Sequence, residues 1–300
     1  MNNVATSISN SGSLAIASKV KDYFQLIKFT LSFTVVFSCV VSYLLVPGIQ
    51  FSFVSVTELF IAGILITGSS NAMNQVVERN TDALMNRTAG RPVASGRMQP
   101  AEAWTFAIVA CITGVFLMGY CFNILSAVIA GISVVLYAFV YTPLKKISSI
   151  AVLVGAFPGA LPCLIGWTAG TNQLSAGGWV LFGIQFLWQF PHFWAIAWVA
   201  YKDYEKAGFK LLPGREGPTK FSALQCIIYS MLMVPVGMLP YYFHLSGVVS
   251  LWILLACNLS MVFLSVLLFL SMKREAARRV MFSSYFYLAV VFLALLFDKI

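Results

Sequence analysis

Charged residues are scarce in this 300-residue chain: they make up 10% of it, whereas 60% of its residues are hydrophobic. A soluble domain carries about 25% charged residues, so this chain has too little polar surface to cover itself in water. We therefore expect it to lie in a bilayer. Its long apolar stretches are continuous rather than alternating, which favours membrane helices of about 20 residues over barrel strands. Nine such runs are present, near 24–46, 54–77, 104–121, 124–141, 150–169, 177–200, 221–243, 247–270 and 280–297.

Paired cysteine motifs and a targeting segment are also missing. The six cysteines lie in or beside apolar runs and form no CxxC pair, so the sequence predicts neither a zinc site nor a disulfide framework. The start of the chain has no early basic segment and no Arg-rich presequence. We expect a flexible cytoplasmic tail over 1–20 and a single polytopic membrane domain over 21–300. The lack of a presequence favours a bacterial inner (cytoplasmic) membrane over an organellar one.

Basic residues are absent from every second connection between the apolar runs, near 47–53, 122–123, 170–176 and 244–246. Eighteen of the nineteen Lys and Arg residues lie in the other connections or at the N-terminus, and only Lys299 falls at the C-terminus. With nine spans, all eighteen lie on one side, which the positive-inside rule makes cytoplasmic. This distribution explains the formal charge of +9 without a nucleic-acid partner. It places the N-terminus inside and the C-terminus outside.

The second apolar run ends in a dense polar stretch, "NAMNQVVERNTDALMNRTAGRP" (71–92). Asn74, Glu78 and Asp82 are spaced four residues apart, so on a helix they share one face. An amide and two carboxylates in a row suit Mg²⁺, which binds carboxylates together with substrate phosphates. Arg87 and Arg91 could then hold phosphate oxygens in a forked geometry. The alternative is a solvated helix end whose acids pair with nearby side chains.

The connection after the sixth run, "WAIAWVAYKDYEKAGFKLLPGREG", is a second polar stretch. Asp203 and Glu205 would share a side in an extended segment but not on a helix. Lysines surround them, Lys202 among them. An ordinary amphipathic cytoplasmic loop explains this stretch equally well.

The chain has only two histidines, and His192 lies inside the sixth run, in "WQFPHFWAIAW". Ionisable groups within membrane spans are functional hypotheses by default. An imidazole there could ligate a haem iron or hydrogen-bond a substrate carboxylate. The alternative is a structural histidine packed beside Gln189 and Pro191. His244 falls in an outer connection, and we expect it to be incidental.

Together these segments resemble the UbiA-type intramembrane prenyltransferases, and among them the haem O branch. The first acidic motif of that family begins with Asn and has acids four and eight residues later, as Asn74, Glu78 and Asp82 do, with Glu where Asp is usual. The haem O branch continues in a pattern that "MNRTAGRP" (85–92) matches. The resemblance covers about residues 20–297. It also includes "YTPLKKIS" from 141, "GAFPGALPCLIGWTA" from 155, and "PHFWAIAW" followed by "KDYEKAGFKLLP".

The chain departs from the family pattern in two places. Lys28 and Phe29 stand where the family has a basic residue and Pro, and the second DxxxD motif is reduced to Asp203 with Glu205. The second departure leaves open whether that loop binds its own Mg²⁺ or only helps to position the diphosphate.

The resemblance implies an all-α bundle of nine transmembrane helices with a central cavity and cytoplasmic active-site loops. It implies transfer of the farnesyl group of farnesyl diphosphate to a vinyl group of protoheme IX (haem B), giving haem O and diphosphate. Mg²⁺ is the expected cofactor, and haem A synthase and terminal oxidase assembly are the expected partners beyond the bilayer. The roles that follow are catalysis by Asn74, Glu78, Asp82, Asp203 and Lys146, metal binding by the first four, diphosphate binding by Arg87, Arg91, Lys145 and Lys202, and haem contact by His192, Tyr141 and Tyr204.

Two other functions fit parts of the sequence. A UbiA-type prenyltransferase could act instead on an aromatic acceptor, such as hydroxybenzoate or a quinone precursor. A transporter of anionic lipids or metabolites is a second alternative, but transporters usually place charges or broken helices near the membrane midplane. The carboxylates here cluster at the ends of the runs, which favours an enzyme.

Overall fold

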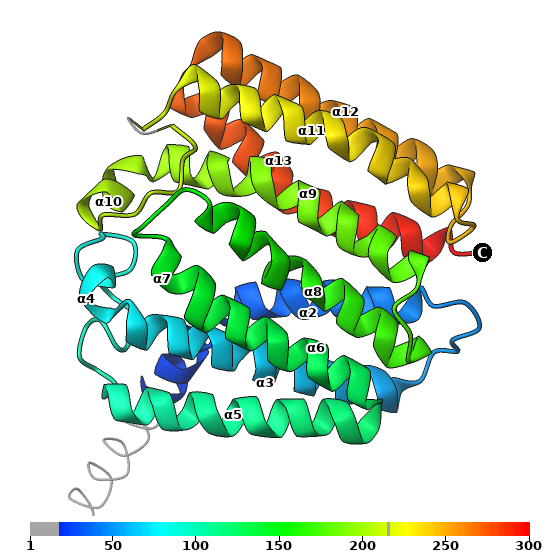
Figure 1. Ribbon diagram of the computed structural model, residues 1–300, viewed down its shortest axis with the longest axis horizontal. Helices are drawn as coiled ribbons and strands as arrows, with labels where there is room; N and C mark the ends of the chain where they lie inside the picture. Colours follow the sequence, from blue (N-terminus) through cyan, green and yellow to red (C-terminus); the bar gives the residue numbers. More distant parts are fainter. Residues whose placement is uncertain (1–17, 215–216) are drawn as a thin grey trace, which may run out of the picture.

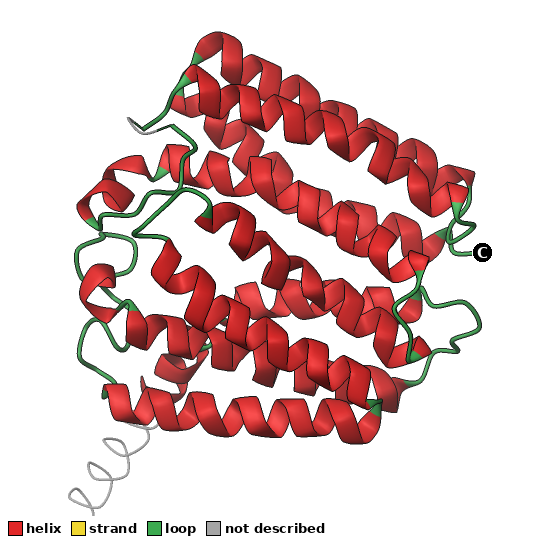
Figure 2. Ribbon diagram, viewed as in Figure 1, coloured by secondary structure: helices red, strands yellow, loops and turns green. Residues whose placement is uncertain are grey.

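The computed structural model describes residues 18–214 and 217–300, and these are almost entirely helical (Figure 2). Among them the only strand-like pairing is an isolated bridge between Ser246 and Lys299. The tail predicted for 1–20 lies, up to residue 17, outside the described residues. The helices are α2 (Phe29–Leu44), α3 (Phe53–Val77), α4 (Arg79–Asp82), α5 (Pro100–Cys121), α6 (Ile124–Val135), the π-helix η1 (Leu136–Tyr141), α7 (Thr142–Leu144), α8 (Ala151–Thr171), α9 (Ala176–Val199), α10 (Tyr201–Lys206), α11 (Lys220–Tyr242), α12 (Val248–Ser271) and α13 (Arg274–Phe297).

The long helices satisfy the length and hydropathy expected of membrane spans. Eight helices pass by themselves, with α6 continuing through η1 into α7, and a ninth span results if Ser18–Leu26 and α2 count as one bent helix. The chain is therefore a multi-pass membrane protein, in agreement with the nine predicted runs. Local signals set the helix starts: the Asn123 side chain accepts a hydrogen bond from the Ser126 amide (2.9 Å), and Pro100 begins α5.

Two apolar cores fill the bundle, one in each half (Figure 1). One core lies among α9, α11, α12 and α13 and includes Leu181, Leu254 and Phe292. The other lies among α3, α5 and α6 and includes Leu59 and Met118. Helices α2 and α8 pack against each other and contribute to both cores. A side chain at Gly166 of α8 would collide with the Cys39 carbonyl, so the missing Cβ allows this close approach.

Helix α8 is continuous through Pro158 and Pro162. Proline lacks an N–H, so each leaves a carbonyl of the preceding turn without its usual partner. The Ser133 hydroxyl donates to the Pro158 carbonyl (3.3 Å), which Pro162 is unable to serve. Amides of α9 reach further carbonyls of the same helix, from Gln185 to Gly159 (2.7 Å) and from Gln189 to Ala156 (3.0 Å). Side chains of neighbouring helices thus keep this proline-rich span regular.

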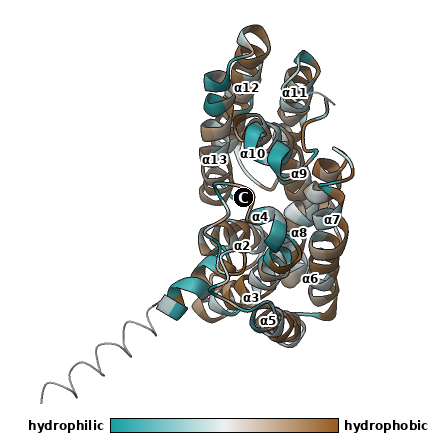
Figure 3. Ribbon diagram, turned by 90° about the vertical axis from the view of Figure 1, so that its left-hand side faces the viewer, coloured by the Kyte–Doolittle hydropathy of each residue, from teal (hydrophilic) through white to brown (hydrophobic). Residues whose placement is uncertain are grey.

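The two ends of the bundle differ in polarity. The connections after α3, α7 and α9 meet at the left-hand end in Figure 1, and hydrophilic residues gather there on α4 and α10 (Figure 3). At the opposite end, Lys299 donates to the carbonyls of Leu44 (2.6 Å) and Val46 (2.7 Å), and burial lowers its pKa. The basic loops thus lie together at one end, which we call the basic end.

Candidate active site at the basic end

The last turn of α3 and the short helix α4 carry the predicted acid–amide row on one continuous face. The backbone kinks at Glu78, which caps both helices. Hydrogen bonds nevertheless continue across the kink, from the Glu78 amide to the Asn74 carbonyl (2.9 Å) and from the Asp82 amide to the Glu78 carbonyl (2.7 Å). The four-residue repeat therefore keeps all three side chains aligned, and all three are buried.

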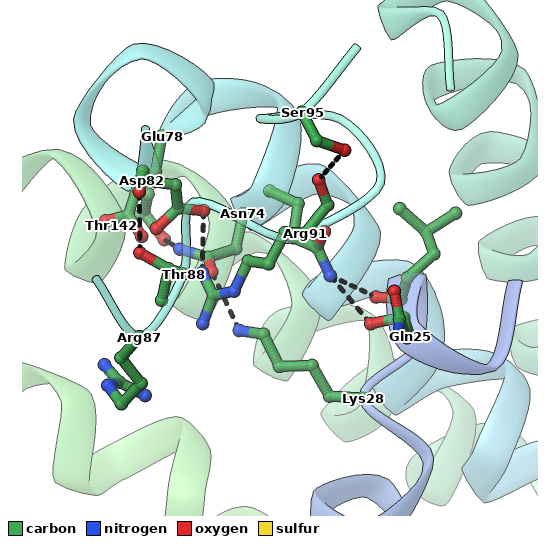
Figure 4. A network of polar contacts seen from close by, with 12 residues as sticks. Gln25, Lys28, Asn74, Glu78, Asp82, Arg87, Thr88, Arg91, Ser95 and Thr142 are labelled. Atoms are coloured by element: carbon green, nitrogen blue, oxygen red, sulfur yellow. Dashed lines mark hydrogen bonds and ion pairs between the residues drawn. The ribbon is translucent and has the colours of Figure 1, made fainter. Parts of the chain in front are cut away.

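A bend at the start of the chain brings a lysine to this row. Ser18–Leu26 and α2 meet at 49°, and Lys28 at the bend adopts the left-handed conformation (φ 48°) that non-glycine residues rarely adopt. Two side-chain amides of α3 donate to carbonyls of the bend: Gln75 to those of Gln25 and Leu26 (both 2.9 Å), and Asn71 to that of Ile27 (3.2 Å). The Lys28 ammonium then donates to the Asn74 side-chain oxygen at 3.0 Å (Figure 4).

Cations pair with both carboxylates of the row. Arg91 Nη1 lies 2.7 Å from Asp82 Oδ2, and Lys145 Nζ lies 2.5 Å from Glu78 Oε1. The Asn74 amide nitrogen donates to the Thr142 hydroxyl at 3.2 Å (Figure 4). Three segments distant in sequence therefore meet at this face, and three cations surround two acids.

The donor set suits a hard divalent cation. Asp82 Oδ1 is buried and accepts no hydrogen bond among the described residues, although an unpaired buried carboxylate oxygen is costly. The two carboxylates and the side-chain oxygen of Asn74 are oxygen ligands of the kind that Mg²⁺ prefers. The described residues contain no group of three or more His, Cys, Asp or Glu side chains that would hold a metal alone. The residues thus fit a Mg²⁺ that is also bound by substrate phosphates.

The second polar stretch forms the short helix α10 beside this row. Because it is helical, Asp203 and Glu205 point in different directions. Asp203 is half-buried and its carboxylate forms no ion pair in the described chain, and Lys202 is exposed. The Tyr201 hydroxyl donates to the Glu205 carboxylate (3.0 Å). This hydrogen bond is the main reason that the pKa of Tyr201 lies above its usual value of 10.0.

Side chains and backbone connect the two polar stretches. Arg87 Nη2 donates to the Tyr204 hydroxyl (3.3 Å), and its guanidinium lies 5.8 Å from the Tyr204 ring. The Lys145 ammonium lies 4.8 Å from the Tyr141 ring and 5.4 Å from the Phe209 ring. The Lys210 amide donates to the Lys145 carbonyl (2.8 Å). The segment after α10 therefore covers the lysine that pairs with Glu78.

Two adjacent lysines with predicted roles occupy unequal positions. Lys145, predicted to bind the diphosphate, is buried in the cluster, whereas Lys146, predicted to be catalytic, is exposed and lies outside it. A cavity of about 800 Å³ opens under the segment after α10, lined by Ser148, Tyr201, Tyr204 and Phe209 among others. None of the three residues of the acid–amide row lines it. The carboxylates of the row are occupied by their ion pairs with Arg91 and Lys145.

His192 lies apart from the acid–amide row, buried between α9 and α13. Its Nδ1 lies 2.8 Å from the Ser284 hydroxyl, and its ring stacks on Trp188. Three residues at these positions had no predicted site role: Lys28, Thr142 and Ser284. Two signals could have identified Lys28, which is a lone lysine within an apolar run and stands where the family pattern has a basic residue.

Known proteins resemble this chain along most of its length. The sequence model of the UbiA prenyltransferase family matches residues 35–295. The chain is 42% identical to the protoheme IX farnesyltransferase of Cytophaga hutchinsonii, over 95% of this chain and 100% of that protein. It is 40% identical to the protein of the same name from Christiangramia forsetii, over 94% of this chain and 95% of that protein.

Solved structures agree on the fold. A structure from work on digeranylgeranylglyceryl phosphate synthase in membranes has a TM-score of 0.78 at 21% identity and covers 94% of this chain and 98% of its own. A UbiA homolog from Archaeoglobus fulgidus bound to GPP and Mg²⁺ has a TM-score of 0.64 at 15% identity, over 91% and 99%. The chain therefore belongs to the UbiA prenyltransferase family, in the group whose members are named protoheme IX farnesyltransferase.

Proposed function

We propose that this protein transfers the farnesyl group of farnesyl diphosphate to a vinyl group of protoheme IX (haem B), giving haem O and diphosphate. The observation that carries the proposal is the 42% identity, along nearly the whole chain, to a protein named protoheme IX farnesyltransferase. The buried acid–amide row beside three cations supports it, because a diphosphate leaving group needs concentrated positive charge. The same identity disfavours an aromatic acceptor, and the lack of a mid-span carboxylate in the described helices disfavours a transporter.

Asn74, Glu78 and Asp82 would hold a Mg²⁺, with Asp203 as a further ligand from the second polar stretch. A related fold binds GPP with Mg²⁺. The bound ion would supply charge neutralisation of the departing diphosphate. The protein contributes the cations. Arg91 and Lys145 pair with the two acids. If the acids bound Mg²⁺ instead, Arg91 and Lys145 would be free to bind phosphate oxygens.

Four further cations surround this position at different depths. Lys28 is held at Asn74 by the bend, and Arg87 lies at the surface against Tyr204. Lys202 is exposed on α10, and Lys146 lies at the loop surface beside Lys145. Lys28 and Arg87 would bind the inner and outer phosphate oxygens, whereas Lys146 and Lys202 would contribute a positive field at the mouth.

The apolar ends of both substrates fit a site that opens to the bilayer. As the allylic C–O bond weakens, the farnesyl carbon becomes cationic, and the surrounding apolar core excludes stray water from it. Tyr141 is placed to shield such a cation, since its ring already lies against the Lys145 ammonium. Electrons of the haem vinyl group would then form the new C–C bond, which moves the positive charge to the vinyl carbon next to the porphyrin. Water would add there as a hydroxyl group, and its proton would pass to the released diphosphate.

The proposal includes a membrane orientation. The basic end would face the cytoplasm of a bacterial inner membrane, as the positive-inside rule predicts, and the relatives above come from bacteria. The N-terminus would then be cytoplasmic. A product as apolar as haem O would remain in the bilayer, where a haem A synthase or an assembling terminal oxidase could take it up.

One assay tests the proposal. Purified protein is incubated with farnesyl diphosphate, haem B and Mg²⁺, and products are identified by mass. We expect haem O and no product without Mg²⁺. Parallel reactions replace haem B with hydroxybenzoate. A prenylated benzoate, or no farnesyl transfer to haem at all, would refute the proposed acceptor.

A further inference from the structure

The imidazole of His192 is held by a chain of hydrogen bonds that fixes which ring nitrogen carries its proton. The Ser284 hydroxyl of α13 donates to the Met281 carbonyl at 2.6 Å and lies 2.8 Å from His192 Nδ1. A hydroxyl has one proton, so an oxygen that donates to Met281 can only accept from His192. The hydrogen on His192 therefore sits on Nδ1, and the lone pair is on Nε2.

The same serine is itself held in place. Trp188 Nε1 donates to the Ser284 carbonyl at 2.9 Å, and the Trp188 and His192 rings stack with centroids 4.6 Å apart. Both rings lie on α9, one helical turn apart, and both face α13. The imidazole is thus fixed in rotamer as well as in tautomer, which a merely space-filling histidine does not require.

Nothing in the described chain uses the lone pair that this arrangement creates. Nε2 has no hydrogen-bond partner among residues 18–214 and 217–300, although the side chain is only 9% exposed. The groups around it are aromatic: the centroid of Phe193 lies 5.4 Å away and that of Tyr285 5.3 Å away. A basic nitrogen among flat apolar rings matches a flat apolar macrocycle with a metal at its centre.

The imidazole also lies on the side of the bundle that carries the diphosphate cluster. It lies about two turns before the end of α9, the end that leads into α10 at the basic end. Tyr285, whose ring meets His192 edge to face, is 49% exposed. A macrocycle bound at His192 would therefore lie near the group that donates the farnesyl chain.

We infer that His192 Nε2 is the axial ligand of the iron of the haem substrate, and that Ser284 is a positioning residue that keeps the proton on Nδ1. The inference rests on the proposed function, since haem is its acceptor. Ligating histidines commonly give their second N–H to a nearby acceptor, which orients the ring and strengthens the metal bond. Here the acceptor is a hydroxyl on the neighbouring helix.

Titration of ferric haem B into the purified full-length protein tests the ligand by absorption spectroscopy. We expect the spectrum of histidine-ligated haem for the wild type and its loss in His192→Ala, with recovery when imidazole is added. His244→Asn is the matched control, because it removes the only other histidine and Asn tolerates the left-handed backbone at that position (φ 54°). An unchanged spectrum in His192→Ala would overturn the inference.

Ser284 variants test the positioning role and leave the imidazole in place, so they decide the matter even where His192→Ala does not purify. Ser284→Ala should weaken haem binding about 10- to 100-fold while the spectrum at saturation remains that of histidine ligation. Ser284→Thr restores a hydroxyl and should restore the affinity. Equal affinity of the wild type and Ser284→Ala would remove Ser284 from the inference.

The product assay separates this inference from the proposed function. A wild-type protein that shows the histidine-ligated spectrum but forms no haem O supports the ligand and refutes the activity. If the wild type forms haem O while His192→Ala keeps the wild-type spectrum, the activity is supported and the ligand is refuted. Size-exclusion profiles of all variants show whether they remain folded.

Discussion

The polar stretches after α3 and α9, which follow the second and the sixth apolar run, are built differently. In the first, every member of the acid–amide row is buried and both carboxylates are paired with cations, Asp82 with Arg91 of the same stretch and Glu78 with Lys145 from a distant segment. In the second, Asp203 is half-buried and unpaired in the described chain. A buried, cross-linked cluster holds its geometry before any ligand arrives, whereas a short surface helix with an unpaired acid can adjust.

This difference suggests a division of labour. On the proposed function, the row after α3 would be a pre-formed half of the site, with cations that are already in place. Helix α10 and the segment behind it would act as the adjustable half, joined to the first by Arg87–Tyr204 and by the Lys210–Lys145 backbone bond. The reduced second acidic motif fits this interpretation, because a half that closes on a bound diphosphate needs fewer metal ligands of its own.

The largest expected effect comes from removing one charge in the pre-formed half. Asp82→Asn should reduce farnesyl transfer by at least about 100-fold, because a Mg²⁺ ligand becomes neutral. The fold should survive, since Thr88 bonds the Asp82 backbone carbonyl rather than its side chain. Initial rates measured by product mass, together with the size-exclusion profile, check both parts.

Asp203→Asn provides the comparison. If α10 is the adjustable half, the rate of farnesyl transfer by this variant should fall about tenfold. Part of the loss should be recovered at high Mg²⁺ concentration, because Asp203 would be a secondary ligand of the ion. Equal losses in the two variants would show that both stretches contribute the same kind of ligand, and the comparison would fail.

The next effect separates two adjacent lysines. Lys145→Met leaves Glu78 buried without its cation, which typically costs about 3 kcal/mol, and it removes positive charge beside the diphosphate. We expect a lower unfolding temperature and at least about a tenfold slower transfer. Lys146→Met should leave the unfolding temperature unchanged and slow transfer much less than Lys145→Met, because that side chain is exposed, lies outside the cluster and adds only to the positive field at the mouth.

A double variant separates stability from chemistry in this pair. Lys145→Met combined with Glu78→Gln should recover much of the lost thermal stability, because the unpaired buried charge is gone, but no activity. A Lys146→Met protein that is as slow as Lys145→Met would contradict the assignment of the diphosphate contact to the buried lysine.

Much of this architecture is readable from the sequence, because hydropathy and helical spacing are local properties. The nine apolar runs correspond to the eight long helices and the bent pair. The four-residue spacing predicted the shared face of Asn74, Glu78 and Asp82, and the backbone hydrogen bonds preserve it across the kink at Glu78. Family membership followed from several short segments whose joint occurrence is specific.

Partnerships between distant segments were not readable in this way. Nothing local distinguishes Lys145 from Lys146; the helical phase of η1 and α7, and the segment laid over them, bury one and expose the other. Lys28 reaches Asn74 because Asn71 and Gln75 bind the carbonyls of a bend 44 to 50 residues upstream. Ser284 lies 92 residues from His192, and no spacing rule connects them.

The smallest expected effect tests whether the two halves are coupled. Arg87 is exposed, so its contact with Tyr204 should contribute only about 0.5–1 kcal/mol. We expect Arg87→Met and Tyr204→Phe each to lower kcat/KM for farnesyl diphosphate a few-fold, because each loosens the same connection. The double variant should be no slower than the slower single variant, whereas the control pair Lys202→Met with Tyr204→Phe should combine multiplicatively. Multiplicative effects for Arg87 and Tyr204 would mean that α10 closes without this contact. Sub-multiplicative effects that weaken at high salt would identify the guanidinium as the connection between the pre-formed and the adjustable half.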